Sequence, residues 1–352
     1  MPLFPEEQLD SPLGYFPAQP GQKLKDGTWT ITRKLGWGPR SSTWLVIDKN
    51  DQHCALKILT AAATAVSNAK TERHFALKAM EAVPNDVPEL LDTFEEKDER
   101  GMKHFCLLFS LFGPSVEDLR QGNAFNGQNL PVNIVQKVIG DISERLTDLA
   151  SENIIHGAVT PDNFLFFSVQ LGDDVREALA KVPADKPVRI EGRDGVWYPT
   201  VKSQPIPNHY TWESKADDIA YAVFSLANFA HARQTTATTL DTPKNIQPPE
   251  APTGNNIDLK SDIWALGCTT YLLLTGKPLF AESYVTSPVK VAQETLGKIE
   301  SLLTANVTEK DLVSTAKFLR MCLSVEIANR ATALELLEGG WVTSGCACGW
   351  CG

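Results

Sequence analysis

The stretch Lys260-Ser261-Asp262-Ile263-Trp264-Ala265-Leu266-Gly267-Cys268 predicts the helix around which the fold is built. Ser261 and Asp262 are residue types that cap helix N-termini, so either of them is expected to cap this one. The residues from Trp264 to Leu274 are apolar on all sides, and a helix without a polar face has to be buried. We therefore expect this helix to be buried inside a domain.

The composition is that of a soluble globular protein. The chain has 352 residues, 43% of them hydrophobic, which suits one large two-lobed domain or two ordinary ones. A net charge of −10 argues against nucleic acid and anionic membranes as partners and permits basic ones. We expect no signal peptide and no membrane span. The scattered cysteines read as reduced core thiols, which favours the cytosol or the nucleus (Cys54, Cys106, Cys268 and Cys322).

Hydrophobic periodicity predicts further elements upstream of this helix. Residues 28–33 alternate as a strand does, and residues 87–108 read as two strands around a charged hairpin. Residues 61–83 should contain a helix, and residues 131–151 have the spacing of a helix with one buried face. Ser115 is expected to cap another short helix, with Asp118 at its third position. A further short helix is expected within residues 173–182.

Three more stretches carry residues suited to chemistry. Residues 34–45 form a glycine-rich segment, and glycines let a backbone approach phosphates closely. A short apolar strand, residues 54–59, then carries the single lysine Lys57. The stretch from Ile154 to Phe166 places His156, Pro161 and Asn163 around a polar loop that leads into an apolar strand.

In this order the motifs resemble those of protein kinases, and in detail those of SR-protein kinases. The likeness extends over residues 14–342 and includes Gly14-Tyr15-Phe16-Pro17, Lys34-Leu35-Gly36-Trp37-Gly38 and the Ser261-Asp262 stretch. It implies an α+β, bilobal protein-kinase-like fold. We expect an N-terminal extension (1–27), a small β-rich N-lobe (28–110), a large, mostly helical C-lobe (111–342) with an insertion at 168–214, and a Cys-rich tail (343–352).

The resemblance implies a set of nucleotide-binding positions, namely Leu35, Gly36, Trp37, Gly38, Ser41, Thr43, Lys57 and Glu72. Lys57 matches the lysine that holds the α- and β-phosphates of ATP. Glu72 is the best candidate for its carboxylate partner, although a more literal alignment places Ala76 there, so an intact ion pair is not assumed. Pro39 departs from the pattern and should stiffen the loop.

Two positions of the resemblance lack the residues that phosphoryl transfer uses. Ala158 stands where kinases have the catalytic aspartate, and a methyl group cannot accept a proton. Ser225 stands where they have the metal-binding aspartate, and a neutral hydroxyl is a poor ligand for Mg²⁺. Asn163 is retained. Asp217 and Asp218 are expected to be turn residues, with replacement metal ligands as the alternative.

Four other matching positions have structural roles in the family. His156 packs under the catalytic loop, and Asp262 holds the backbone of that loop. Glu250 pairs with Arg330 and ties the large lobe together. The tail from Ser344 to Gly352 contains three more cysteines, for which disorder, acylation, metal binding and redox sensing stay open.

The resemblance therefore implies a pseudokinase that acts as a scaffold or regulatory binding module. It would bind ATP weakly without Mg²⁺, or take no cofactor, and no metal site is expected. A protein partner is expected, either another kinase or a basic Arg/Ser-rich peptide, and the oligomeric state is left open. The alternatives are an active atypical Ser/Thr protein kinase or other ATP-dependent transferase, and a decayed kinase paralogue.

Overall fold

The computed structural model describes most of the chain, and all structural statements refer to these residues. They are residues 6–7, 13–66, 68–84, 86–122, 129–167, 171–192, 194–206, 222–237, 242–251 and 257–343. The chain divides into two compact units. The first unit comprises Met1–Met80, Pro88–Pro114 and Val169–Asn208, and the second comprises Glu81–Val87, Ser115–Ser168 and His209–Gly352.

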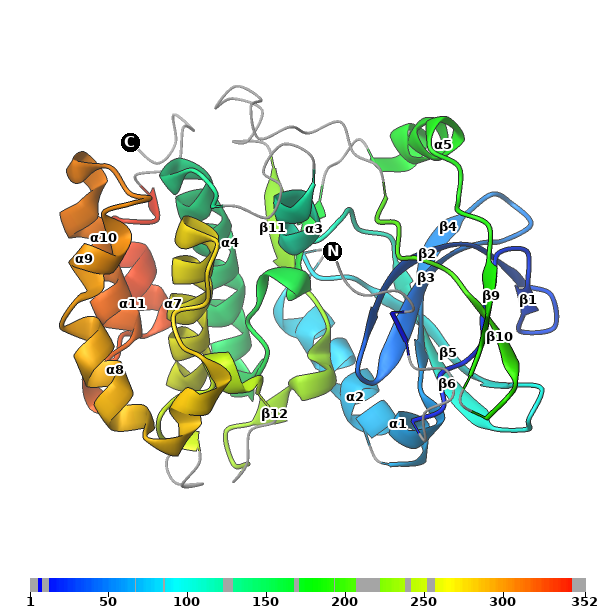
Figure 1. The fold of residues 1–352 in the computed structure, drawn as a ribbon, viewed down its shortest axis with the longest axis horizontal. Coiled ribbons are helices and arrows are strands. Elements are labelled where there is room, and N and C mark those ends of the chain that lie inside the picture. The colour runs from blue at the N-terminus through cyan, green and yellow to red at the C-terminus, as the bar shows by residue number, and fades with distance from the viewer. Residues whose placement is uncertain are drawn as a thin grey trace. The chain divides into compact units, whose positions relative to one another are not determined.

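The first unit is built on a six-stranded antiparallel sheet with the strand order β1-β2-β3-β4-β6-β5 (Figure 1). One face of this sheet carries a core of alternating apolar side chains, among them Ile31, Trp44 and Leu56. The strands are β1 (Lys23–Leu24), β2 (Trp29–Gly38), β3 (Ser41–Ile47), β4 (His53–Leu59), β5 (Leu90–Lys97) and β6 (Lys103–Ser110). Strands β5 and β6 confirm the pair predicted around the charged hairpin.

Two helices follow β4, namely α1 (Ala61–Ala65) and α2 (Asn68–Ala82). Thr60 caps α1, because its side chain accepts a hydrogen bond from the backbone N–H of Ala63. The predicted helix of residues 61–83 is therefore present in two pieces.

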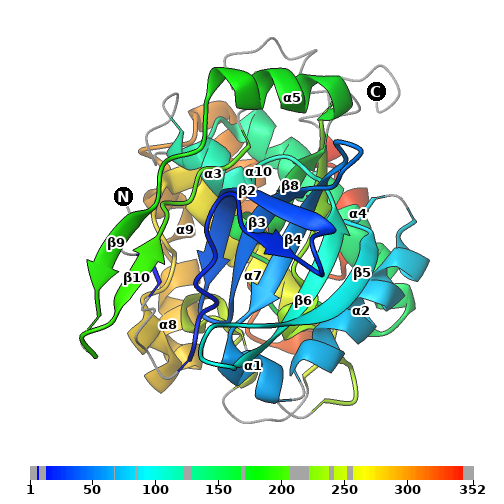
Figure 2. The ribbon, with the colours of Figure 1, turned by 90° about the vertical axis from the view of Figure 1, so that its right-hand side faces the viewer.

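Residues 169–208 of the insertion belong to the first unit, whereas the prediction assigned the whole insertion to the C-lobe. It contains α5 (Leu171–Lys181) and a hairpin of β9 (Val188–Glu191) with β10 (Trp197–Thr200). Figure 2 shows the two strands of this hairpin side by side. The physical reason for the assignment is packing: Val175 and Ile206 bury apolar surface against Leu45 of the sheet.

The predicted boundaries differ in three further places. The N-terminal extension is part of the first unit, since β1 extends its sheet. That unit runs on to Pro114 rather than ending at residue 110, and residues 81–87 belong to the second unit.

The second unit is mainly helical. In it α4 and α7 lie side by side (Figure 1), and Trp264 of α7 is completely buried. Its helices are α3 (Val116–Gln121), α4 (Val132–Ser151), α7 (Lys260–Thr275), α8 (Pro288–Leu296), α9 (Ile299–Leu303), α10 (Glu309–Cys322) and α11 (Ala333–Glu338). Two short antiparallel pairs complete it: β8 (Phe164–Phe167) with β11 (Val223–Leu226), and β7 (Ile154–Ile155) with β12 (Arg233–Gln234).

The prediction for the start of α7 was wrong. Neither Ser261 nor Asp262 caps this helix; its N-cap is Leu259, which makes no side-chain cap, and Asp258 accepts the N–H of Lys260 at 2.7 Å. Asp262 is turned to other partners, which are described below. The predicted cap at Ser115 is confirmed: its hydroxyl accepts the N–H of Asp118, and the carboxylate of Asp118 accepts the N–H of Ser115.

The four core cysteines are buried and unpaired, as predicted. In the described ranges, no helix has the length and apolar character needed to cross a membrane.

Candidate functional site

The glycine-rich segment forms the end of the β2–β3 hairpin in the first unit. Gly36 pairs with Thr43 and Gly38 with Ser41, so Pro39 and Arg40 form the turn. A side chain added at Gly36 or Gly38 would meet no described atom within 4 Å. The backbone there is accessible to a ligand, although Pro39 provides no N–H at the tip.

Lys57 is held by a carboxylate in the same unit. It lies on β4 opposite Thr43, and its Nζ is 2.5 Å from Oε1 of Glu72 on α2. The two side chains are only 11% and 3% exposed. Glu72, not Ala76, is thus the partner of Lys57, and the ion pair that the sequence left undecided is present.

The other predicted nucleotide-binding residues differ in their surroundings. Ser41 is buried, and Trp37 is 42% exposed. Leu35 packs against the cluster that joins Leu45 to the insertion residues Val175 and Ile206. The insertion therefore reaches the glycine-rich segment at Leu35.

In the second unit, Asp262 holds the loop that follows β7. Its Oδ2 accepts the N–H of His156 at 2.6 Å, and its Oδ1 accepts that of Gly157 at 2.8 Å. Gly157 has φ +77°, and a Cβ there would lie 2.6 Å from the carbonyl oxygen of His231. Only glycine fits this position. Asp262 makes the backbone contacts that the resemblance implied.

His156 is completely buried beneath the same loop. Its Nε2 lies 3.0 Å from the carbonyl oxygen of Ala227, and its Nδ1 lies 3.3 Å from the N–H of Ala158. One neutral tautomer, with the proton on Nε2, satisfies both contacts. Burial, which disfavours the imidazolium, lowers the pKa of His156 to about 4.

We expect His156 to make the protein more stable as pH rises from about 4 to about 6.5. In this window the unfolded chain binds a proton at this side chain and the folded chain does not, so the free energy of unfolding increases with pH. The gain should be about 3 kcal/mol, at about 1.36 kcal/mol for each unit of pKa shift. Denaturant unfolding of wild type and His156→Gln across this pH range measures it as the difference between the two proteins.

The comparison with His156→Gln is needed because Asp262 acts in the opposite direction. Burial raises the pKa of Asp262 to about 6, so its contribution to stability falls as pH rises towards that value. Both proteins retain Asp262, and its effect cancels in the difference. A difference that stays constant between pH 4 and 6.5 would contradict the assignment of a neutral, buried imidazole.

Ala158 and Asn163 lie together, and the side chain of Ala158 has no proton acceptor. Ala158 is 2% exposed. The side chain of Asn163 donates to the carbonyl oxygen of Ala158 at 2.8 Å and accepts from Nδ2 of Asn228 at 2.8 Å. Asn163 therefore ties the loop to the segment after β11.

Ser225 lies in the middle of β11 and is completely buried. Its hydroxyl donates a hydrogen bond to the backbone carbonyl oxygen of Asp86. The preceding N–H, of Phe224, donates to Oδ2 of Asp141 at 3.0 Å. The position of the family's metal ligand is thus occupied by a short side chain that is bonded within the core.

Glu250 and Arg330 form the tie that the resemblance implied. Two guanidinium nitrogens of Arg330 donate to the two carboxylate oxygens of Glu250 at 2.8 and 2.9 Å. The guanidinium also lies 5.1 Å from the ring centroid of Trp264. Ser261, through its hydroxyl, contacts Glu250 at 3.4 Å.

Within the described ranges, no group of three or more His, Cys, Asp or Glu side chains is arranged to hold a metal ion. Asp217 and Asp218, the alternative metal ligands, lie outside the described residues, and so do the tail cysteines.

Sequence reasoning missed Asp141 and Asp86. Asp141 lies on α4 among apolar positions, is itself buried, and also pairs with Lys137 at 2.6 Å. A carboxylate that interrupts an apolar helix face was the available signal, because a buried charge requires partners. Asp86 acts through its backbone, which no sequence pattern indicates.

Comparison with known proteins gives one consistent result. A family model described as the protein kinase domain matches residues 214–342. The chain is 27% identical over 287 residues to a serine/threonine-protein kinase, SRPK, of Physarum polycephalum, with 76% of this chain and 65% of that protein covered. It is 29% identical over 159 residues to protein kinase dsk1 of Schizosaccharomyces pombe, covering 43% and 29%, and 28% identical to human SRSF protein kinase 3, covering 43% and 27%.

A crystal structure of a kinase domain is also similar to this chain, with a TM-score of 0.62 and 17% identity. The alignment covers 93% of this chain and 98% of that one, and it shows the fold. The chain spans less than two thirds of the length of each of the three curated relatives named above.

Proposed function

Because the chain belongs to the protein kinase superfamily and is similar to SR-protein kinases, we propose that it is a kinase-like binding module impaired in phosphoryl transfer. The observation that carries this proposal is that the side chain of Ser225 is buried and hydrogen-bonded to the backbone of Asp86. A completely buried hydroxyl that already donates to a backbone carbonyl offers Mg²⁺ neither a charge nor a free lone pair directed at solvent.

The second support is Ala158, which stands at the position of the catalytic base. Loss of a general base typically costs a factor of about 10²–10⁴ in rate. Loss of metal stabilisation adds several kcal/mol to the barrier. Starting from about 1–100 s⁻¹ for an ordinary kinase, the remaining turnover would be too slow to be useful.

We further propose that nucleotide binds without divalent metal through the first unit. The Lys57–Glu72 pair keeps an ammonium group positioned at 2.5 Å from its carboxylate, and the backbone at Gly36 and Gly38 is open. An ammonium next to the triphosphate would supply part of the charge compensation that Mg²⁺ normally gives. Binding is expected to be weak.

The partner we propose is a basic Arg/Ser-rich peptide or another kinase, in the cytosol or the nucleus. The net charge of −10 favours basic partners. One of the relatives is described as an SRSF protein kinase, and the peptide class follows from that likeness alone.

We expect ATP to raise the melting temperature of the protein equally with Mg²⁺ and with EDTA. At about 100 times its Kd, a ligand stabilises the native state by about 2.7 kcal/mol, which is a shift of several degrees at this size. Lys57→Ala should abolish the shift. The measurement is a thermal melt against ATP concentration, with Lys103→Ala as a control, because Lys103 is 59% exposed in a surface ion pair.

An active enzyme is the second candidate, favoured by the intact Lys57–Glu72 pair. It predicts a shift that requires Mg²⁺ and phosphotransfer that Lys57→Ala abolishes. No shift under any condition would remove nucleotide binding from the proposal and leave a protein scaffold.

A further inference from the structure

Lys34 is a completely buried cation at the first position of the glycine-rich segment, and the proposed nucleotide binding does not use it. Its side chain is 0% exposed. A buried ammonium without partners costs several kcal/mol even after the structure relaxes. The fold must therefore supply anions at this place.

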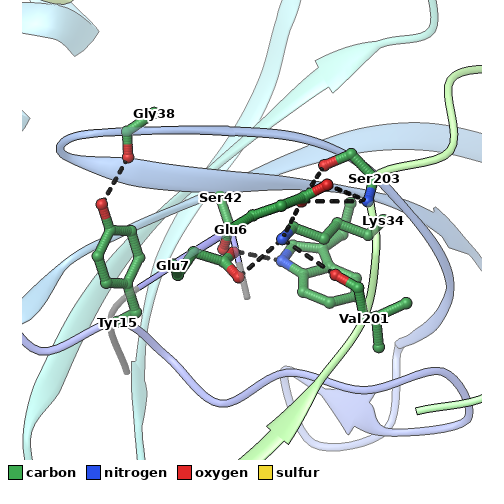
Figure 3. A network of polar contacts seen from close by, with 9 residues as sticks. Glu6, Glu7, Tyr15, Lys34, Gly38, Ser42, Val201 and Ser203 are labelled. Carbon is green, nitrogen blue, oxygen red and sulfur yellow. Dashed lines mark hydrogen bonds and ion pairs between the residues drawn. The ribbon is translucent and has the colours of Figure 1, made fainter. Parts of the chain in front are cut away.

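The anions come from the N-terminal residues Glu6 and Glu7 (Figure 3). Nζ of Lys34 lies 2.8 Å from Oε2 of Glu6, 2.7 Å from Oε2 of Glu7 and 3.2 Å from the carbonyl oxygen of Val201. Three acceptors thus match the three N–H bonds of the ammonium. The two carboxylates are 3% and 6% exposed.

The insertion completes this site on the other side. Ser203 donates its backbone N–H to both carboxylate oxygens of Glu6, at 2.9 and 3.1 Å, and its hydroxyl to Oε2 at 2.7 Å. The segment is fixed next to β2, because the N–H of Gln204 donates to the carbonyl oxygen of Lys34 at 2.8 Å. Glu6 therefore sits among donors from two separate parts of the chain.

The two carboxylates are not equivalent. Burial works against ionisation of Glu6, but the hydrogen bonds from Lys34 and Ser203 outweigh it and lower its pKa. Burial prevails at Glu7, whose pKa is raised, since Lys34 is its main compensation. Glu6 is the anion that fits the site best, and Glu7 supplements it.

From these contacts we propose that Lys34, Val201 and Ser203 form a binding site for an acidic peptide, and that Glu6–Glu7 of the same chain is its resident ligand. The site recognises two adjacent carboxylates through one buried ammonium, one backbone N–H and one hydroxyl. An acidic peptide of another chain binds there only when the resident pair has left. This proposal does not depend on nucleotide binding.

We expect occupancy of the site to stabilise the glycine-rich segment. Tyr15, a few residues after the resident pair, donates its hydroxyl to the carbonyl oxygen of Gly38 at 2.8 Å (Figure 3). Lys34 directly precedes Leu35 on the same strand. Departure of Glu6 and Glu7 would leave Lys34 uncompensated and would loosen the start of this segment, whereas a bound acidic peptide would restore it.

The test uses the full chain carrying Glu6→Gln and Glu7→Gln, and a fluorescent peptide with the sequence of residues 1–12. We expect fluorescence anisotropy to show binding to this double variant. Binding to wild type should be at least about tenfold weaker, because a ligand tethered by a short linker competes at an effective concentration near millimolar. A peptide with glutamine in place of both glutamates should not bind.

The matched control is Glu95→Gln, which removes one carboxylate from an exposed ion pair with Lys103 in the same unit. This variant should behave like wild type. Adding Lys34→Met to the double variant should abolish peptide binding. A folded double variant that binds no peptide at millimolar concentration, or that still binds it after Lys34→Met, would overturn the proposal.

A second measurement tests the exposure of Lys34 directly, without measuring the affinity of a peptide. Acetylation of lysines, followed by mass spectrometry, should leave Lys34 unmodified in wild type and modify it in the double variant, with protection restored by the acidic peptide. Equal protection of Lys34 in wild type and in the double variant would likewise overturn the proposal.

Discussion

Arg330→Met is expected to lower the free energy of unfolding by about 3–5 kcal/mol, since it removes one partner of a buried ion pair. Glu250 would keep its charge at a side chain that is only 9% exposed. The carbonyl oxygens of Ser324 and Lys260, each 3.0 Å from a guanidinium nitrogen of Arg330, would also lose a donor. Urea unfolding followed by circular dichroism measures the change.

The same substitution at Arg320 is the control. Arg320 forms an equally direct pair with Glu300, at 2.5 Å for both bonds, but both side chains are more than 40% exposed. An exposed pair is worth about 1 kcal/mol or less. Equal losses for Arg320→Met and Arg330→Met would show that burial does not set the cost, and the structural tie between Glu250 and Arg330 would then be unsupported.

Ser225→Asp is expected to destabilise the protein by about 3 kcal/mol and to leave the melting shift with ATP independent of Mg²⁺. A carboxylate cannot donate to the carbonyl oxygen of Asp86, and at a completely buried position it would be an unpaired charge. Strand β11 cannot easily move to expose it, because Asp141 holds the neighbouring N–H of Phe224. Restoring the family's residue should therefore not restore the metal site.

Ser225→Ala separates the two effects, since it removes the hydrogen bond without adding a charge. It should cost about 1 kcal/mol. If Ser225→Asp were as stable as wild type and its melting temperature rose only with ATP and Mg²⁺ together, β11 would be ready to hold a metal and the proposed impairment would be wrong.

The fold follows from local sequence patterns, and so do the positions of the glycine-rich segment, Lys57 and Asp262. Lys57 is placed by the strand register that joins it to the glycine pair Gly36 and Gly38. Asp262 is placed by its position in the first turn of the apolar helix α7. Sequence spacing does not decide the partner of Lys57, because Glu72 and Ala76 lie one helical turn apart on the same face of α2. Only the packing of α2 distinguishes them.

Other features depend on contacts between distant parts of the chain. Asp262 is one such feature: its residue type predicts a helix cap, and only the family resemblance implied the bonds that its carboxylate accepts from two buried N–H groups of the loop at His156. The pairing of Lys34 with Glu6 joins residues with no common pattern, and Ser203 comes from an insertion whose packing no periodicity reveals.

The first unit is assembled from three separate pieces of chain, the last of which ends at Asn208. During synthesis, the sheet up to β6 emerges well before Val201 and Ile206, which complete its apolar clusters. At ~5–20 residues per second, the ribosome leaves this sheet incomplete for several seconds. Contacts between residues this far apart in the sequence form slowly, and we expect the apolar face of the nascent sheet to stay open to aggregation until the insertion has been made.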